Sequence, residues 1–181
     1  MAPGRYGAFL GRAVDSMAAM DRTITEMAGL GADHAKVLAS GPVSIKEFGK
    51  VGPPQFSTDQ LVAICRLARE RRLPLMAHAN GPEAVAQCLE ARVESVEHGY
   101  FMGRENLKKL ADTQTSWIPT IQPLAALLAR ETRPLPRDIL ARTIDHQVAQ
   151  LATARASGVR TVLGTDAGAP GLAVGPGLRS E

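Results

Sequence analysis

The sequence predicts an α/β fold, namely a partial TIM (β/α)8 barrel with about five parallel strands and their helices. Short apolar segments alternate five times with segments of helical periodicity, which is typical of a parallel sheet. Histidine or aspartate ends three of these apolar segments, as expected where barrel strands converge on a ligand. The chain has 181 residues, whereas a complete barrel takes about 250.

The whole chain, residues 1–181, is expected to form a single domain. No linker-like or low-complexity segment separates the units, and a content of 45% hydrophobic and 22% charged residues is ordinary for a globular core. Apolar strands that alternate with helices further predict a parallel sheet that helices cover on both faces.

The first expected unit is a helix over residues 11–29, followed by a strand over residues 34–40. A loop rich in glycine and proline then spans residues 41–56. Ser57 predicts the N-cap of a second helix, because Gln60 stands three residues later, as in a capping box.

The same unit repeats along the rest of the chain. Further strands are expected over residues 73–79, 93–99, 116–120 and 160–168, helices over residues 82–91, 104–112 and 137–156, and a long loop over residues 121–136. The apolar face expected for the last helix consists of Leu140, Ile144, Val148 and Leu151.

Side chains that bind metals recur at one place in this pattern. His78, His98 and Asp166 each end an expected strand, and Lys36 lies within the first one. Because the carboxyl ends of parallel strands meet on one rim, we expect these four side chains to face one cavity. Strand alternation places Glu97 on the strand face opposite to His98, where it would support the ligands or face the helices and not bind the metal itself. Neutral imidazoles and a carboxylate are good ligands for zinc and related divalent ions, so the set predicts a metal site.

Lys36 fits such a site only after chemical modification, because a protonated ammonium group repels a cation. Burial in an apolar strand favours the neutral form of an amine, and the neutral amine can react with carbon dioxide to give a carbamate. A carbamate is an anionic oxygen ligand that can bridge two metals. The alternative is an unmodified lysine whose ammonium group reaches the solvent beside the strand.

Each of these residues also has a simpler interpretation. A single histidine at a strand end is usually a hydrogen-bonded core or surface residue, and Asp166 is a turn former among glycines. The segment GTDAGAPG (164–171) is a second candidate site, for a phosphate group, but it lacks a lysine. His34 and His146 have no comparable context and are assigned no role. The metal-site interpretation depends on the set of four residues.

Composition and charge exclude several classes of function. The formal net charge is only +3, and no basic stripe interleaved with aromatic residues indicates nucleic-acid binding. No apolar run approaches the roughly 18 residues of a membrane span. The first residues lack the apolar stretch of a secretory signal, and Cys65 and Cys88 lack metal-type spacing. We therefore expect a cytoplasmic protein with two reduced core thiols and no nucleic-acid or membrane partner.

Five segments carry a resemblance to a known family: GADHAKVLASG (31–41), LPLMAHANG (73–81), VESVEHG (93–99), IPT (118–120) and VLGTDAGAPG (162–171). Together they resemble the metal-dependent amidohydrolase superfamily, particularly the branch that contains imidazolonepropionase-like enzymes and Xaa-Pro or Xaa-Arg dipeptidases. In order and spacing they are similar to strands four to eight of that family's barrel. The resemblance implies that the N-terminal barrel strands and the flanking β-sandwich of the family are absent here.

The resemblance also implies roles for the four site residues. Lys36 would be the carboxylated lysine that bridges two metals, and His78 and His98 would be metal ligands. Asp166 would be both a ligand and the base that takes a proton from metal-activated water. The implied reaction is hydrolysis of a C–N bond in a small amide, cyclic amide or dipeptide, with one or two divalent ions, of which zinc is the expected one.

Three departures from the family pattern qualify this expectation. The strand that ends in His-x-His, and that supplies the more buried metal site, has no counterpart in the sequence. Gly41-Pro42 replaces the usual paired glycines after the lysine strand, and the loop after GTDAGAPG lacks the usual histidine. We expect a fragment of a longer amidohydrolase that self-associates through open sheet edges. The alternatives are a non-catalytic metal-binding or structural α/β module, and an unrelated α/β domain that binds a phosphorylated ligand.

Overall fold

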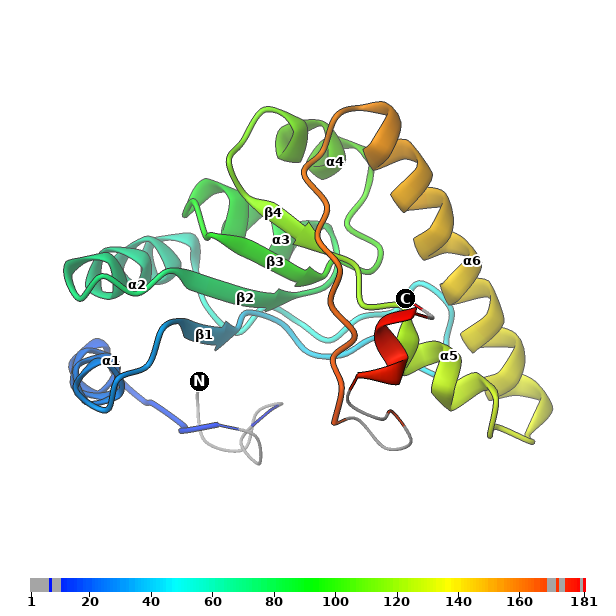
Figure 1. Ribbon diagram of the computed structural model, residues 1–181, viewed down its shortest axis with the longest axis horizontal. Coiled ribbons are helices and arrows are strands. Elements are labelled where there is room, and N and C mark those ends of the chain that lie inside the picture. The colour runs from blue at the N-terminus through cyan, green and yellow to red at the C-terminus, as the bar shows by residue number, and fades with distance from the viewer. Residues whose placement is uncertain (1–6, 8–10, 169–171, 173–174, 180) are drawn as a thin grey trace.

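The computed structural model describes residues 7, 11–168, 172, 175–179 and 181. Its elements follow one another (Figure 1) as α1 (Met17–Gly29), β1 (Ala35–Leu38), α2 (Thr58–Glu70), β2 (Leu75–Ala79), α3 (Pro82–Glu90), β3 (Ser95–His98), α4 (Arg104–Ala111), β4 (Ser116–Ile118), α5 (Gln122–Leu128), α6 (Pro134–Ala156) and the 3₁₀ helix η1 (Pro176–Arg179). From α1 to β4 this is the repeating strand and helix unit that the sequence predicts.

The four strands form one parallel sheet in chain order, β1-β2-β3-β4 (Figure 1). Each helix between two strands returns the chain to the start of the next strand, as parallel neighbours require. The predicted α/β architecture with parallel strands is therefore confirmed. One row of paired residues across the sheet contains Leu38, His78, Glu97 and Ile118. Side chains in one row of a parallel sheet share one face.

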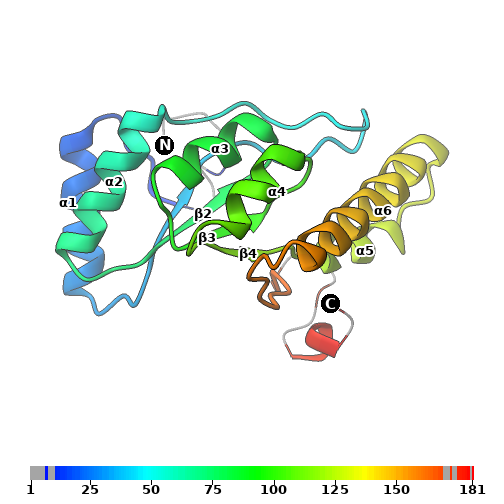
Figure 2. The ribbon, with the colours of Figure 1, turned by 90° about the horizontal axis from the view of Figure 1, so that it is seen from above.

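Helices cover one face of this sheet. Helices α2 and α3 pack against β2, and α4 continues the same helix layer (Figure 2). The strand residues that face this layer are apolar and buried: Val37, Ala77, Val96 and Trp117. The expectation of helices on both faces is wrong for the described residues. The opposite face bears His78 and Glu97, which cannot be buried against an apolar helix without polar partners.

Two expected elements are wrong near the carboxyl end of the chain. Residues 160–168 form no strand, because Thr161 makes only an isolated parallel bridge with Trp117 and the pairing stops after Val162. The neighbouring β4 has three residues, which leaves little backbone for a fifth strand to pair with. Residues 121–136, expected as a loop, contain α5 and the start of α6, and each helix has a proline in its first turn.

Side-chain caps determine where the first two helices begin. Helix α1 starts at Met17 and not at residue 11, because the Ser16 hydroxyl accepts a hydrogen bond from the Ala19 amide at 3.2 Å. The capping box of α2 is confirmed, since Ser57 Oγ accepts from the Gln60 amide at 3.3 Å and Gln60 Oε1 accepts from the Ser57 amide at 2.9 Å. These bonds satisfy amides that the first turn of a helix leaves unpaired.

The main core lies between the sheet and the helix layer, and a smaller apolar cluster that includes Leu124 and Leu140 joins α5 to α6. Helix α6 turns Leu140, Ile144 and Leu151 of the expected face toward the interior. Val148 departs from the expectation, because it is 50% exposed whereas its neighbour Gln147 is fully buried. Cys65 and Cys88 are buried free thiols, as expected. Across the described residues, no helix has the length and apolar character needed to cross a membrane.

Candidate functional site

The structure places all four residues selected from the sequence around one cavity of about 190 Å³: Lys36, His78, His98 and Asp166. Other polar groups in the wall of this cavity come from Asn80, Tyr100 and Thr120. The apolar part of the wall comes from Leu38, Pro42, Val43, Pro123 and Leu124. A concave, partly apolar cavity with a few convergent polar groups is typical of a small-molecule site.

His78 and His98 lie next to each other in this cavity. Their ring centroids are 4.5 Å apart, and the ring planes are inclined by 69°. His78 Nε2 lies 3.4 Å from the carbonyl oxygen of Gly41 and 3.3 Å from Asn80 Nδ2. His98 Nδ1 lies 2.5 Å from Thr120 Oγ1. Polar contacts therefore orient both imidazoles before any ligand is bound.

His98 reaches the cavity through a turn and not through strand alternation. In the register it pairs with Ala79, which is fully buried on the helix-facing side of β2. The Gly99 amide donates to the Glu97 carbonyl at 3.0 Å, which closes a γ-turn around His98. The φ of His98 is +69°, and this form of γ-turn is rare and strained. The turn rotates the imidazole from the helix side to the side of His78.

Glu97 lies on the cavity side of the sheet, so the expectation that it faces the helices is wrong. It shares its register row with His78 and is only 5% exposed. Burial raises the pKa of its carboxyl group, and the hydrogen bond from Ser95 Oγ, 2.5 Å from Glu97 Oε1, partly offsets this rise. The sequence did contain a signal, because apolar Val96 stands between Ser95 and Glu97 and directs both polar residues to the other face.

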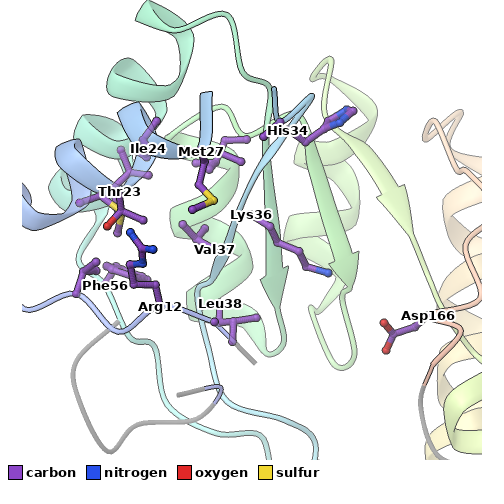
Figure 3. A pocket seen from close by; sticks show the side chains of 17 residues that line it. Arg12, Thr23, Ile24, Met27, His34, Lys36, Val37, Leu38, Phe56 and Asp166 are labelled. Carbon is purple, nitrogen blue, oxygen red and sulfur yellow. The ribbon is translucent and has the colours of Figure 1, made fainter. Parts of the chain in front are cut away.

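Lys36 and Asp166 point toward each other across a second, larger cavity of about 680 Å³ (Figure 3). Apolar residues of α1 and β1, such as Ile24 and Val37, form much of its wall. Lys36 is exposed, so the expected burial of its amine is not observed. The reason is that β1 is an edge strand of the described sheet. Asp166 is also exposed, with a φ of +49°, and it does not end a strand as expected.

The cavity holds both histidines in the neutral form at neutral pH. Burial lowers the pKa of His78 to about 4, against the opposing effect of its contact with the Gly41 carbonyl. Burial also lowers the pKa of His98 well below its usual value, and the neighbouring His78 and Lys36 act in the same direction. A neutral imidazole keeps a lone pair on one ring nitrogen, which can bind a metal.

The low pKa of His78 predicts that acid destabilises the metal-free chain. Between pH 6.5 and about pH 4 the unfolded chain takes up a proton that folded His78 does not accept. The free energy of unfolding should therefore fall as the pH drops through this window, by about 3 kcal/mol once the loss is complete. Urea unfolding at neutral and mildly acidic pH should show a smaller loss for His78→Gln than for the wild type. Equal losses in the two proteins would contradict this prediction.

The donor chemistry of the cavity fits a divalent metal ion in part. Two neutral imidazoles are suitable zinc ligands, and Asp166 brings a carboxylate to the same cavity. Over the part of the chain that the structure describes, no three His, Cys, Asp or Glu side chains converge closely enough to hold an ion. The histidine pair thus offers two ligand positions, and Lys36 and Asp166 line the cavity without completing the set.

The other candidates from the sequence lie elsewhere. His34 is exposed at the start of β1. His146, expected on the polar side of its helix, is instead partly buried, with its ring centroid 4.6 Å from that of Phe101. The proposed phosphate loop GTDAGAPG (164–171) lies partly outside the described residues, because residues 169–171 are not among them.

The model of the amidohydrolase family matches the sequence over residues 11–175. The chain belongs to the amidohydrolase family. The family predicted from the sequence is therefore confirmed. No curated protein matches the sequence significantly.

Solved structures resemble this amidohydrolase chain over most of its length. An amidohydrolase is 27% identical, with a TM-score of 0.75 over 94% of this chain and 40% of its own. A Xaa-Pro dipeptidase with methionine in its active site is 26% identical, with a TM-score of 0.71 over 86% of this chain and 39% of its own. The A. niger ochratoxinase, 22% identical with a TM-score of 0.73 over 85% of this chain and 35% of its own, shows the fold alone. The chain spans between 35% and 40% of the length of these proteins, which confirms the partial barrel.

Proposed function

We propose that this chain provides part of the active site of a hydrolase that cleaves C–N bonds in small amides, cyclic amides or dipeptides. The observation that carries the proposal is the pair of buried neutral histidines, His78 and His98, in one cavity with Lys36 and Asp166. Membership of the amidohydrolase family supports it. The share of the related structures that the chain covers supports the proposal that it is part of a longer enzyme.

In the proposed site, His78 and His98 bind a divalent metal, and zinc is the ion that best suits imidazole and carboxylate ligands. A metal bound there would lower the pKa of water and polarise the scissile carbonyl group. Lys36 would join the ligand set as a carbamate, which forms when the neutral amine adds carbon dioxide and releases a proton. Lys36 lines the larger cavity, so a group that covered this cavity would bury its side chain. Burial favours the neutral amine over the ammonium group.

Asp166 is the proposed general base. Its carboxylate takes a proton from the attacking water and delivers it to the leaving nitrogen atom. Thr120 Oγ1, at 2.5 Å from His98 Nδ1, holds the imidazole in one orientation and leaves Nε2 as the nitrogen that binds a ligand.

The apolar wall of the smaller cavity indicates the kind of substrate. Val43, Pro123 and Leu124 lie in the same wall as the histidines and favour an apolar group beside the scissile bond. The related Xaa-Pro dipeptidase holds methionine in its active site. Dipeptides with apolar side chains are therefore the first substrates to test.

A second candidate function is a non-catalytic metal-binding or structural module. The observation that favours it is the incomplete ligand set, since the described residues bring no third His, Cys, Asp or Glu side chain to the histidine pair. Such a module would bind zinc through His78 and His98 without hydrolysing a substrate.

An activity assay of the zinc-loaded chain on apolar dipeptides and small amides tests the proposed hydrolase. Asp166→Asn should lower kcat by about 10²–10⁴-fold, the range expected for the loss of a general base. Asp145→Asn, at an exposed position on α6, should leave kcat unchanged. Equal rates for Asp166→Asn and the wild type would contradict the role of Asp166. Zinc binding by the wild type without hydrolysis would favour the non-catalytic module.

We also propose a cytoplasmic location and self-association. The two buried, unpaired cysteines support the first, because disulfides are rare in that compartment. The open edge of β1 supports the second, because an edge strand offers unpaired backbone groups to another chain.

A further inference from the structure

Two glutamines of α6, Gln147 and Gln150, are buried where an apolar residue is the usual choice. Gln147 is fully buried, and Gln150 is 6% exposed. A buried amide group without hydrogen-bond partners costs about 1–3 kcal/mol. Their partners therefore indicate why glutamine stands at these positions.

Both glutamines donate to the backbone of the turn that follows β3. Gln147 Nε2 lies 2.5 Å from the carbonyl oxygen of His98. Gln150 Nε2 donates to the carbonyl oxygen of Gly99 at 3.2 Å and to Gln147 Oε1 at 2.8 Å. Trp117 Nε1 adds a second donor to the His98 carbonyl at 2.9 Å. Three buried side chains thus hold two consecutive carbonyl groups.

These two residues of the turn have a left-handed backbone. The φ angles are +69° at His98 and +64° at Gly99, so the chain leaves the strand geometry there. A left-handed conformation at a non-glycine residue costs about 1–3 kcal/mol and persists only where the surroundings enforce it. The donors from α6 and from Trp117 are surroundings of this kind, because they bind the His98 carbonyl in the orientation that the turn gives it.

We propose that Gln147, supported by Gln150, is a positioning residue for His98, so that α6 fixes the metal-binding imidazole in the cavity. The proposal rests on the proposed function, in which His98 binds the metal. By register His98 would face the helices, and the turn is what brings its ring to within 4.5 Å of the His78 ring. The contact with Thr120 orients the ring only after the turn has placed it there.

If Gln147 had a purely structural role, its replacement would lower the free energy of unfolding without changing zinc affinity or the resonances of His98. Thr143 provides the matched control. Thr143 is 2% exposed on the same helix, and its hydroxyl donates to the carbonyl oxygen of Ile139 at 2.7 Å. Thr143→Val removes a buried hydrogen bond from α6 without touching the turn at His98. Gln147→Met removes the bond to His98 and keeps a side chain of similar length and volume.

The test measures the zinc affinity and the imidazole ¹H–¹⁵N resonances of both variants in the full chain. Gln147→Met should weaken zinc binding by about 10–100-fold, the usual effect of losing a group that orients a ligand. In the metal-free chain it should shift the ring resonances of His98 and leave those of exposed His34 in place. Thr143→Val should change neither the affinity nor the resonances, even where it lowers the free energy of unfolding.

A folded Gln147→Met chain with unchanged zinc affinity and unchanged His98 resonances would overturn the proposal. Where Gln147→Met does not fold, Gln150→Met replaces it, because this variant keeps the bond between Gln147 and His98. Smaller changes of both quantities would then support the proposal, and no change would overturn it. A wild-type chain that binds no zinc refutes the proposed function, whereas the His98 resonances of metal-free Gln147→Met still decide the positioning role.

Discussion

Replacing His78 or His98 with alanine is expected to abolish zinc binding by this chain. Their rings lie 4.5 Å apart in one cavity, and each brings one nitrogen ligand. Among the described side chains no third His, Cys, Asp or Glu group joins them, so neither loss can be compensated. We expect each substitution to weaken zinc binding by more than the roughly 10–100-fold that follows the loss of an orienting partner.

Zinc content after dialysis and a competition titration measure this effect. His34→Ala is the matched control, because His34 is exposed and lies outside the cavity that holds the pair. The control should retain the wild-type zinc affinity. Unchanged zinc content in both cavity variants would show that the site assignment is wrong for a hydrolase and for a metal-binding module alike.

The fold could be predicted from the sequence where local patterns determine it. The capping box of Ser57 and Gln60 lies within four residues, and the structure contains both of its hydrogen bonds. The strand over residues 160–168 could not be predicted correctly, because a strand depends on its partner. Its partner β4 is only three residues long, and a local apolar pattern does not contain that information.

The choice of site residues followed from topology, but their orientation did not. Strand ends meet on one rim, which is why Lys36, His78, His98 and Asp166 could be chosen before the structure was known. Glu97 lies on the cavity side through ordinary strand alternation, and the γ-turn at His98 then reverses the alternation and brings His98 to the same side. A backbone conformation that tertiary contacts enforce is not encoded in a two-residue period.

Helix α6 is a second case in which a local sequence pattern does not determine how a side chain is placed. Periodicity selects Val148 for the core, yet Val148 is 50% exposed and its neighbour Gln147 is fully buried. The carbonyl group of His98 accepts from Trp117 Nε1, and Gln147 supplies a second donor to it at this point. A buried polar residue of this kind is recognised only from the group that it satisfies, which lies on a different element.

Replacing Gly99 with alanine is expected to destabilise the chain more than the same change at Gly158. Both glycines have a positive φ, +64° at Gly99 and +74° at Gly158, so alanine costs about 1–2 kcal/mol at either position. A Cβ atom at Gly99 would also clash with the terminal methyl group of Met102 and lie 2.6 Å from Trp117 Nε1, whereas nothing lies within 4 Å at Gly158. Overpacking of this kind adds about 1–3 kcal/mol.

Urea unfolding, followed through the fluorescence of the single tryptophan, Trp117, measures the difference between the two variants. The methionine can move its flexible end, but the fully buried indole cannot move without loosening its bond to the His98 carbonyl. Gly99→Ala should therefore lower zinc affinity as well as stability, and Gly158→Ala should lower stability alone. Equal unfolding free energies for the two variants would mean that the indole of Trp117 can move without an energetic cost. The surroundings would then not hold the turn at His98 in place.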